Sequence, residues 1–253
     1  HTDIKFGFYT LLLSECKCEA YAYGHQYYDF SDGTLVCLTP GESISMKENN
    51  KRFPSKGWIL AFHPDLICGT PLGLNIHNYT FFSYRPEEAL HISQREKQII
   101  LEFLEKINQE LQRCIDRHSK KIISKYIELL LDYCIRFYER QFITRNGANK
   151  KIIKDFSLLL DTHISTKAVQ STGMLSSEYC AKFLHLSPAY LNDLLIYETG
   201  KSFNEYIQFK RFEVAKDWLQ NTDKPLNQIA EELGFSNSQY FSRLFKKITG
   251  CSP

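Results

Sequence analysis

Four polar side chains with hydrogen-bonding chemistry lie close together near the C-terminus. Ser238, Gln239, Ser242 and Arg243 recur at the three- and four-residue intervals that place side chains on one face of a helix. An arginine fork matches the two acceptors of guanine in the major groove, and a glutamine amide matches adenine in the same two-point way. The pattern predicts a helix whose polar face contacts base edges.

Basic residues continue along the same predicted helix. Lys246 and Lys247 follow the polar cluster, and residues 237–250 contain three basic groups and no acidic group. Phe241 and Phe245 fall on the opposite face, which predicts burial against a core. We expect the two lysines to contact phosphates. The alternative is an ordinary amphipathic helix with a solvated basic face.

The eight cysteines do not form a metal-binding pattern. They are scattered, without a Cys-x-x-Cys pair or a His-x-x-x-His, and structural zinc usually needs such paired ligands. Cys16 and Cys18 are the only close pair, and on a strand their thiols share one face, so a reactive-cysteine repair or redox regulator stays open. We otherwise expect reduced thiols, with Cys114, Cys134 and Cys180 on apolar stripes.

Three histidines are the remaining candidates for metal ligands. His25, His63 and His77 lie far apart, and the His-x-His pair with a following Glu that a barrel metal centre uses is missing. We therefore predict packing or surface positions for them and no bound metal. A glycine-rich phosphate loop, a nucleophile elbow and paired catalytic carboxylates are also missing. We predict neither a cofactor nor an enzyme.

Aromatic side chains are concentrated between residues 21 and 30. Aromatic faces suit sugars and aromatic ligands, so Tyr21, Tyr23 and Tyr28 are candidate effector-binding residues. The same side chains suit the core of a barrel, and the sequence leaves both roles open.

The composition is that of a globular protein with a substantial core. The chain has 253 residues, of which 43% are hydrophobic and 24% charged, and its net charge of +2 is too small to name a partner. This length favours two domains. No apolar run approaches the ~20 residues of a membrane span, and His1-Thr2-Asp3 opens without a secretory leader. We expect a cytoplasmic protein that contacts no membrane.

Residues 1–92 are predicted to form a β-rich domain. Short runs of aromatic and β-branched residues alternate with turn signals such as Ser31-Asp32-Gly33. The predicted strands are residues 6–13, 18–23, 34–38, 43–46 and 58–62. Many short strands at close spacing favour a barrel or a sandwich.

Residues 93–145 change to a helical period. Ser93 and Glu96 form the two ends of a capping box, and an apolar stripe follows. A second amphipathic helix is predicted over residues 120–138. Such helices either cover the sheet or pair with a second copy of the chain, and residues 146–149 are predicted to separate them from the next domain.

Residues 150–253 are predicted to form an all-α domain that contains an internal repeat. The string AKFLHLS at 181–187 returns 49 residues later as AEELGFS at 230–236. Each copy predicts a short helix, a tight turn and a second helix opened by Ser. Gly234 supplies the positive φ that the turn needs. His185, which tolerates positive φ better than most residues, takes that place in the first copy.

A longer helix is predicted between the two copies, preceded by a helix over residues 150–163 and a polar loop over 165–173. Ser202 and Glu205 form its capping box, and it stops at the polar, proline-containing run 221–225. About 18 residues at roughly 1.5 Å each make a rod of about 27 Å. One turn of B-DNA is about 34 Å. Such a rod could hold two recognition helices on successive major grooves.

Residues 175–253 resemble the paired helix-turn-helix domain of AraC/XylS-type bacterial transcription regulators. The matching strings are EYCA at 178–181, LSPAYL at 186–191, ETGKSF at 198–203, IAEELGF at 229–235 and QYFSRLFKK at 239–247. Residues 1–90 resemble less specifically the cupin-like sensor barrel of such regulators, and LTPGE at 38–42 fits its Pro-Gly turn. The resemblance implies that the helices at 93–141 form a homodimer.

The resemblance also implies DNA contacts in the first copy. Ala189, Asn192 and Asp193 occupy its base-facing positions, although Asp193 stands where a basic residue is common. Residues 187–201 hold one basic and two acidic groups, so a largely structural role for this copy stays open. The expected phosphate contacts there are Tyr190, Lys201, Ser176 and Ser177.

The sequence therefore predicts an α+β protein of two domains that regulates transcription from promoter DNA in response to a small-molecule effector. The resemblance favours an activator that recruits RNA polymerase. The alternative is a cupin-type enzyme or ligand-binding protein with an accessory DNA-binding domain.

Overall fold

The computed structural model describes residues 2–5, 7–14, 33–46, 57–166, 169, 173–235 and 237–250. The chain divides into two compact units, His1–Ala148 and Asn149–Pro253. The predicted strand at 18–23, the candidate effector residues Tyr21, Tyr23 and Tyr28, and the close pair Cys16 and Cys18 lie outside the described residues, as does His25.

A four-stranded antiparallel sheet forms the centre of the first unit. Its strand order is β5 (Gly57–Phe62), β2 (Tyr9–Ser14), β3 (Gly33–Leu38) and β6 (Leu90–Ile92). Leu11 on β2 pairs with Cys37 on one side and with Leu60 on the other. Leu11 and Leu13 are buried while Leu12 and Ser14 are partly exposed, the alternation expected of a strand with one face on a core. A separate two-stranded ribbon pairs β1 (Thr2–Lys5) with β4 (Ser43–Met46).

The prediction of a β-rich segment up to residue 92 is wrong for residues 63–88. This stretch forms α1 (Pro64–Ile67), α2 (Pro71–Asn75) and three short 3-10 turns. Pro64 and Pro71 stand at the first helical positions, and His63 and Thr70 cap them by accepting hydrogen bonds from main-chain amides. The chain then returns to the sheet as β6, a strand that was not predicted. The described strands form the sheet and the ribbon, and the closed cupin-like barrel stays a prediction.

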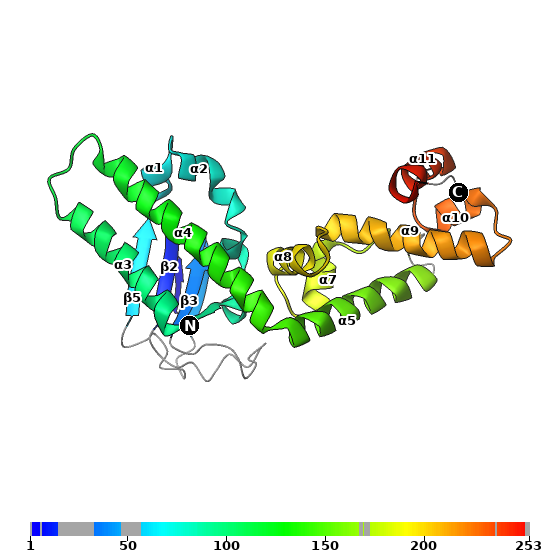
Figure 1. Ribbon diagram of the computed structural model, residues 1–253, viewed down its shortest axis with the longest axis horizontal. Helices are drawn as coiled ribbons and strands as arrows, with labels where there is room; N and C mark the ends of the chain where they lie inside the picture. The colour runs from blue at the N-terminus through cyan, green and yellow to red at the C-terminus, as the bar shows by residue number, and fades with distance from the viewer. Residues whose placement is uncertain are drawn as a thin grey trace. The chain divides into compact units, whose positions relative to one another are not determined.

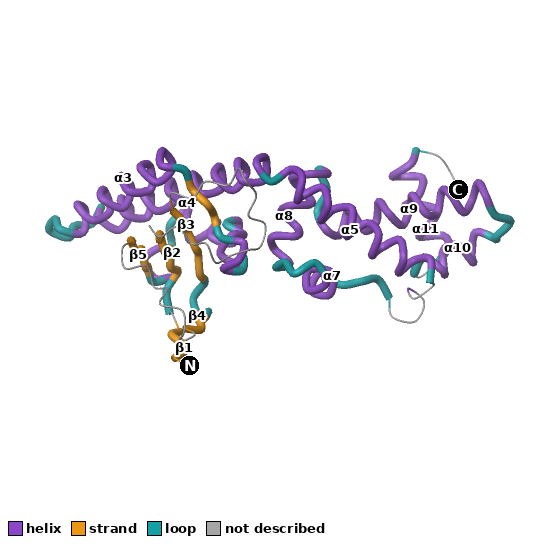
Figure 2. The backbone as a smooth tube through the Cα atoms, turned by 90° about the horizontal axis from the view of Figure 1, so that it is seen from below, coloured by secondary structure: helices purple, strands orange, loops and turns teal. Residues whose placement is uncertain are grey.

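Helices α3 (Gln94–Leu111) and α4 (Ser119–Thr144) cover one face of the sheet (Figures 1 and 2). The predicted apolar stripe of α3 is buried from Ile100 to Ile107, but its last member, Leu111, is 63% exposed. Ile127, Leu130 and Leu131 of α4 are buried as well. The capping box of Ser93 and Glu96 forms as predicted. Both helices, α3 and α4, therefore lie against the sheet.

Polar contacts tie α4 to the neighbouring strand. Arg140 donates two hydrogen bonds to Glu96, at 3.0 and 2.8 Å, and one of 2.6 Å to the carbonyl of His91 on β6. Gln141, which is 1% exposed, accepts from the His91 amide at 2.8 Å and donates to the Ala89 carbonyl at 3.2 Å. These bonds satisfy the edge of β6 and fix the position of α4 on the sheet.

The predicted boundary at residues 146–149 is not a loop. Helix α4 continues to Thr144, and α5 (Asn146–Ser165) begins after Arg145 alone. A single glycine, Gly147, is not enough to interrupt the helix, because its cost of about 1 kcal/mol is offset by the neighbouring turns. The division between the two units falls within α5, after Ala148.

The second unit is helical throughout its described part. After α5 it contains α7 (Ser177–Phe183), α8 (Pro188–Thr199), α9 (Phe203–Asn221), α10 (Leu226–Glu232) and α11 (Ser238–Thr249). Val169, inside the predicted polar loop, is 2% exposed and belongs to the core around α9, α10 and α11. Val169 is also helical, so the prediction of a polar loop over 165–173 is wrong at this residue.

The described thiols are free. Cys37, Cys134 and Cys180 are buried, and burial raises the pKa of Cys134 to about 12 and that of Cys180 to about 11. Cys114 was predicted on an apolar stripe but is exposed, because α3 ends at Leu111 before the stripe reaches it. Among the described residues, no helix is both long and apolar enough to cross a membrane.

Candidate nucleic-acid interface

The two predicted repeats fold into the same helix–turn–helix geometry. In the first copy the Leu186 amide donates to the Ala181 carbonyl at 2.8 Å, and in the second the Phe235 amide donates to the Ala230 carbonyl at 2.9 Å. Both alanines are buried, at 0% and 1% exposure, where a larger side chain would separate the helices. The two sequence repeats thus form the same main-chain hydrogen bond across their turns.

Both turns contain a residue with positive φ at the predicted position. His185 has φ 57° and Gly234 has φ 74°. Gly234 has a second reason to be glycine, which the sequence did not show: a Cβ there would lie 2.6 Å from Cγ1 of Val169. The turn of the second copy is therefore packed against the segment that precedes α7.

The second helix of each copy begins at a polar cap. Ser187 accepts a hydrogen bond from the Tyr190 amide at 3.2 Å, as predicted for the start of α8. At α11 the cap is Asn237, which accepts from the Tyr240 amide at 2.6 Å. The prediction that a serine opens both second helices is therefore wrong for α11, where Asn237 offers the oxygen next to the helix. Ser236 lies outside the described residues.

Helix α11 separates an apolar face from a polar one. Phe241 and Phe245 are 0% and 5% exposed and contact Phe212 of α9, with ring centroids 6.2 and 6.0 Å apart. Gln239 and Arg243 are exposed on the other side. The core holds the helix from behind, so the side chains predicted to contact bases face solvent.

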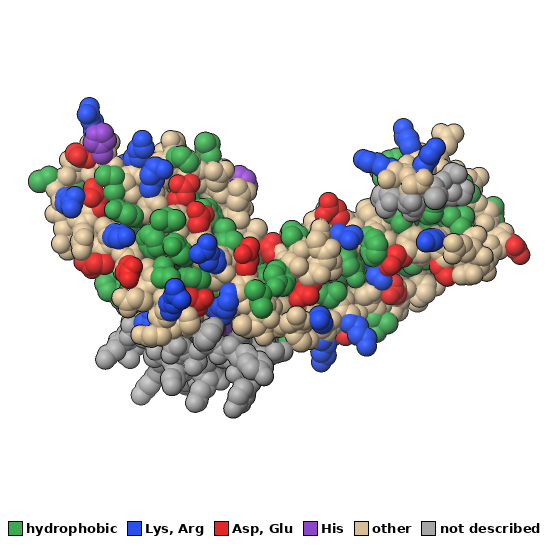
Figure 3. Space-filling model, viewed as in Figure 1, with side chains coloured by type: hydrophobic (Ala, Val, Ile, Leu, Met, Phe, Trp, Pro, Cys, Tyr) green, Lys and Arg blue, Asp and Glu red, His purple; other side chains and the backbone are tan. Residues whose placement is uncertain are grey.

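The rest of the predicted polar face is distributed along α11. Ser238 and Ser242 are partly exposed, and the Ser242 hydroxyl donates to the Ser238 carbonyl at 2.9 Å. Lys246 and Lys247 are exposed in the last turn, where cations also interact favourably with the helix dipole. Figure 3 shows Lys and Arg side chains gathered over α11.

The first copy presents a different surface. On α8, Asn192 accepts a hydrogen bond from the Phe203 amide at 3.0 Å, so its side chain already caps the start of α9. Ala189 and Asp193 are partly exposed, while Ile196 and Tyr197 are 47% and 41% exposed. The base-facing positions of α8 therefore offer few free donors.

The predicted phosphate contacts of the first copy need one correction. Tyr190 is 3% exposed, because its ring fills the core beneath α8, and it does not lie on the surface. Lys201 lies at the surface with its ammonium 4.8 Å from the ring centre of Phe209.

The N-terminus of α7 contains Ser176, Ser177 and Glu178. Ser176 caps the helix by accepting from the Tyr179 amide, and Ser177 donates to Glu178 at 3.1 Å. Hydrogen bonds from its own amide, then from Ser176 and Ser177, lower the pKa of Glu178. An ionised carboxylate at this site opposes the phosphate contact predicted for the two serines.

Two long helices connect the copies. Phe156 of α5 packs on Phe203 and Tyr206 near the start of α9, with centroids 5.6 and 5.4 Å apart. Further along, Ile164 of α5 and Phe212 of α9 belong to the core of the second copy. The same two helices thus contribute to both copies, which restricts rotation of one copy against the other.

Arg211, a residue that the sequence reasoning missed, links α9 to the second turn. It is 6% exposed, donates to the Leu233 carbonyl at 2.9 Å and to Gln208 at 3.1 Å, and lies 3.7 Å from the ring centre of Phe235. Burial lowers its pKa to about 10. The available signal was its spacing, because Arg211 lies four residues after Ile207 and four before Ala215, on the apolar face of the helix.

An ion pair with a buried carboxylate joins the segment before α10 to the last residue of that helix. Glu232 is 2% exposed and accepts from Lys224 at 2.6 Å and from Gln228 at 2.8 Å. Lys224 also lies 4.1 Å from the ring centre of Trp218 on α9. These contacts hold the segment between α9 and α10 against both helices.

Two helix–turn–helix units on shared supporting helices, one with an exposed polar and basic face on its second helix, define a DNA-binding domain. Residues 180–253 match the helix-turn-helix domain family. A Bacillus subtilis HTH-type transcriptional regulator, YtdP, is 43% identical over 79 residues, 31% of this chain and 10% of that protein. The Escherichia coli HTH-type transcriptional regulator YijO is 26% identical over 223 residues, 87% of this chain and 74% of that protein.

Among solved structures, the C-terminal domain of AraT, a response regulator from Geobacillus stearothermophilus, is 36% identical with a TM-score of 0.34. The match covers 40% of this chain and 79% of that one. The family match identifies the C-terminal domain as an AraC-type helix-turn-helix domain, and the curated relatives that it resembles are HTH-type transcriptional regulators. The chain spans only a tenth of YtdP and about three quarters of YijO.

Proposed function

We propose that the chain is an effector-responsive regulator that binds promoter DNA through α8 and α11. The observation behind this proposal is the division of α11, which presents Gln239, Arg243, Lys246 and Lys247 to solvent while its phenylalanines anchor the core. Arg243 would pair with a guanine and Gln239 with an adenine. Lys246 and Lys247 would neutralise phosphates on either side of the groove.

The supporting helices suit two successive major grooves. Helix α9 has 19 residues, which corresponds to about 28 Å at 1.5 Å per residue. This length is close to the ~34 Å repeat of B-DNA. We propose that α11 supplies most of the base contacts and that α8 mainly positions the domain, since Asn192 is engaged in capping α9. The proposed contacts are Ser238, Gln239, Ser242 and Arg243 to bases, with Ala189 and Asp193 at the α8 surface, and Lys246, Lys247 and Lys201 to phosphates. Ser176 and Ser177 are left out because of the neighbouring Glu178 carboxylate.

We propose that residues 93–145 form the dimer interface. Ile122, Leu129 and Ile143 of α4 lie in one seven-residue series, which also contains the exposed Arg136, and are 37%, 47% and 60% exposed. Such a stripe on an otherwise folded helix is typical of a helix–helix contact between copies. Figure 3 shows hydrophobic side chains on the face of the first unit that α3 and α4 form.

We assign effector sensing to residues 1–92, for which a cupin-like barrel remains our proposal, and DNA binding to residues 150–253. Binding of an effector would shift the population between arrangements of the two units. By resemblance to the AraC/XylS type, the regulator would activate transcription by recruiting RNA polymerase, and it would act in the bacterial cytoplasm where the DNA lies.

The proposal is tested by fluorescence-anisotropy titration against duplexes from upstream of the chain's own gene, with scrambled competitor. Arg243→Ala should weaken binding by about 1–3 kcal/mol and relax the preference at one base pair. Arg85→Ala, an exposed arginine of the first unit outside residues 93–145, is the control and should leave the affinity unchanged. If Arg243→Ala keeps both affinity and sequence preference, α11 does not contact bases.

A further inference from the structure

A cavity of about 670 Å³ lies in the first unit, between the start of α4 and the turn that joins α1 to α2. Cys68, Gly69 and Thr70 line it on the side of the turn, and α4 lines it on the other. Its volume falls within the range of small-molecule sites, about 300–1,000 Å³. The size therefore suits one small ligand rather than a polymer.

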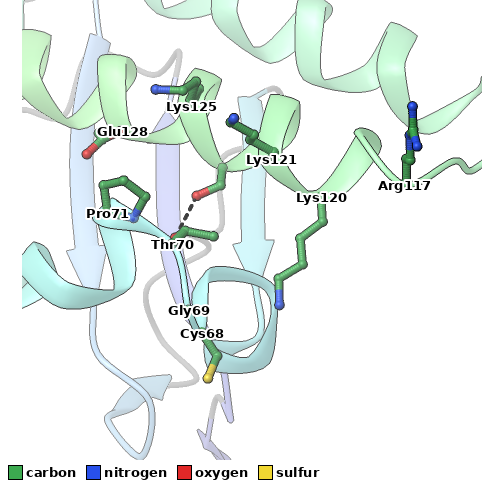
Figure 4. Close-up of a pocket in the computed structure, with 10 residues that line it drawn as sticks. Cys68, Gly69, Thr70, Pro71, Arg117, Lys120, Lys121, Lys125 and Glu128 are labelled. Carbon is green, nitrogen blue, oxygen red and sulfur yellow. Dashed lines mark hydrogen bonds between the residues drawn. The ribbon is translucent and has the colours of Figure 1, made fainter.

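The α4 side of this cavity is strongly basic. Arg117, Lys120, Lys121 and Lys125 line it, against the single carboxylate of Glu128. All four cations are exposed, and the three lysines form no ion pair with any described residue. Figure 4 shows Lys120 extending from α4 toward the turn. The long, rotatable stems of the other two lysines allow their ammonium groups to reach a ligand in the cavity.

Hydroxyl groups lie where the two walls meet. Ser124, which is 2% exposed, donates to the Thr70 hydroxyl at 3.0 Å (Figure 4). Thr70 in turn caps α2 by accepting from the Gly73 amide at 3.2 Å. The bond fixes the distance between the turn and α4, so the cavity is held open by the fold.

The placement of these cations is unfavourable without a ligand. Lys120, Lys121 and Lys125 lie in the first two turns of a 26-residue helix whose first turn contains no acidic residue. Cations at a helix N-terminus oppose the helix dipole, and like charges four residues apart repel. The Asp116 carboxylate already accepts from the His118 and Ser119 amides at this helix start, at 2.7 and 2.9 Å. A bound anion in the cavity would therefore chiefly relieve the repulsion between the lysines.

We propose that this cavity binds a small organic anion with several negative oxygens, either a phosphate ester or a di- or tricarboxylate. Its role as the effector site rests on the regulator function proposed above. Helix α4 leads into α5 of the DNA-binding unit through Arg145 alone. A ligand bridging α4 and the α1–α2 turn would therefore act on the helix that continues toward the DNA-binding domain.

The test is isothermal titration calorimetry of the full chain with pyrophosphate and with citrate, at constant ionic strength. We expect saturable binding of at least one probe, and the stronger probe distinguishes phosphate from carboxylate ligands. The variant Lys120→Gln/Lys121→Gln should weaken this binding by about tenfold or more. The control Arg95→Gln/Lys106→Gln removes the same charge from exposed positions of α3 and should change it by less than about twofold.

Glu128→Gln gives a result of the opposite sign. Removing the one carboxylate at the cavity should tighten binding of the same probe severalfold, which a loss of structure would not do. No saturable binding of either probe, or an equal loss in the control variant, would overturn the proposal. Calorimetry needs no DNA, so a failure of DNA binding and a failure of anion binding are separate results.

Discussion

At the scale of single residues, neighbouring side chains of α11 have different roles. Phe241 and Phe245 hold the helix to the core, while Arg243 and Lys246 face solvent. Because base contacts and phosphate contacts obey different physics, substitutions on the same helix should have different signatures. Arg243 should affect sequence preference, and Lys246 should affect the electrostatic part of the affinity.

Lys246→Ala should weaken binding to operator and scrambled DNA alike. Loss of one phosphate contact should reduce the slope of log affinity against log salt by about 1. Anisotropy titrations at several salt concentrations measure the slope, and Arg243→Ala is the matched comparison on the same helix. An unchanged slope in Lys246→Ala would place this ammonium away from the phosphate backbone.

Gly234→Ala tests the second turn. Both Gly234 and Gly200 have positive φ, but a Cβ at Gly200 meets nothing within 4 Å, whereas one at Gly234 lies 2.6 Å from Val169. Gly200→Ala should cost about 1–2 kcal/mol from the backbone alone, and Gly234→Ala should cost more. Urea unfolding measures both.

A double variant isolates the contact. Gly234→Ala combined with Val169→Ala should be less destabilised than the sum of the two single variants, by about 0.5–3 kcal/mol, since the clash is removed. Additive costs would mean that Val169 does not restrict residue 234.

At the scale of elements, α5 and α9 determine how the two helix–turn–helix copies are presented. Each helix contributes aromatic or aliphatic residues to both copies. The start of α9 is stabilised by a capping box between Ser202 and Glu205, whose carboxylate accepts from the Ser202 amide at 2.8 Å and from its hydroxyl at 2.7 Å. The stability of the first turn of α9 should therefore depend on the negative charge of Glu205.

Stability of the DNA-binding unit should fall in acid through Glu205. Its hydrogen bonds with the Ser202 hydroxyl and then amide lower its pKa below the ordinary 4.5. A lowered folded-state pKa means that the stabilisation is complete above the unfolded pKa and is lost as pH falls through the folded value. Glu205→Gln should therefore be less stable than the parent near neutral pH, with the difference shrinking at about pH 3.

Urea unfolding at the two pH values measures this difference. Glu231→Gln changes an exposed glutamate of α10 whose side chain forms no hydrogen bond with the described residues, and this control should show little change. A Glu205→Gln deficit that is equal at both pH values would assign the effect to something other than ionisation.

At the scale of the whole molecule, the basic surface over α11 and the apolar stripe on α4 lie on different units. One would contact DNA and the other a second copy of the chain. Pairing two copies doubles the number of helix–turn–helix units available to one operator, which raises affinity through the effective concentration of the second domain.

Leu129→Glu should prevent pairing by placing a charge within the apolar stripe. Light scattering after size-exclusion chromatography should give a dimer for the parent and a monomer for this variant. Leu158→Glu, which changes a 64% exposed leucine on α5, should leave the dimer intact. A monomeric parent at high concentration would contradict the interface.

Much of the DNA-binding domain could be predicted from the sequence because its determinants are local. These determinants are the repeated alanine at Ala181 and Ala230, the positive φ at His185 and Gly234, and the capping boxes at Ser93 and Ser202. Each of them depends on residues within one or two turns of each other. The polar and apolar faces of α11 follow from helical spacing alone. Such short-range signals are present in any stretch of sequence that is long enough to show its period.

The sequence by itself thus determined the helix–turn–helix class, the second helix of each copy and the residues of α11 that face solvent. Only the tertiary structure decided that Arg211 caps the second turn, that Val169 requires Gly234 to be glycine, and that Tyr190 is buried. It also brought the basic start of α4 to the turn at Thr70, some fifty residues earlier in the chain. These contacts join segments that lie far apart in the sequence. They depend on how the segments pack, and this packing produces no periodic pattern in either segment.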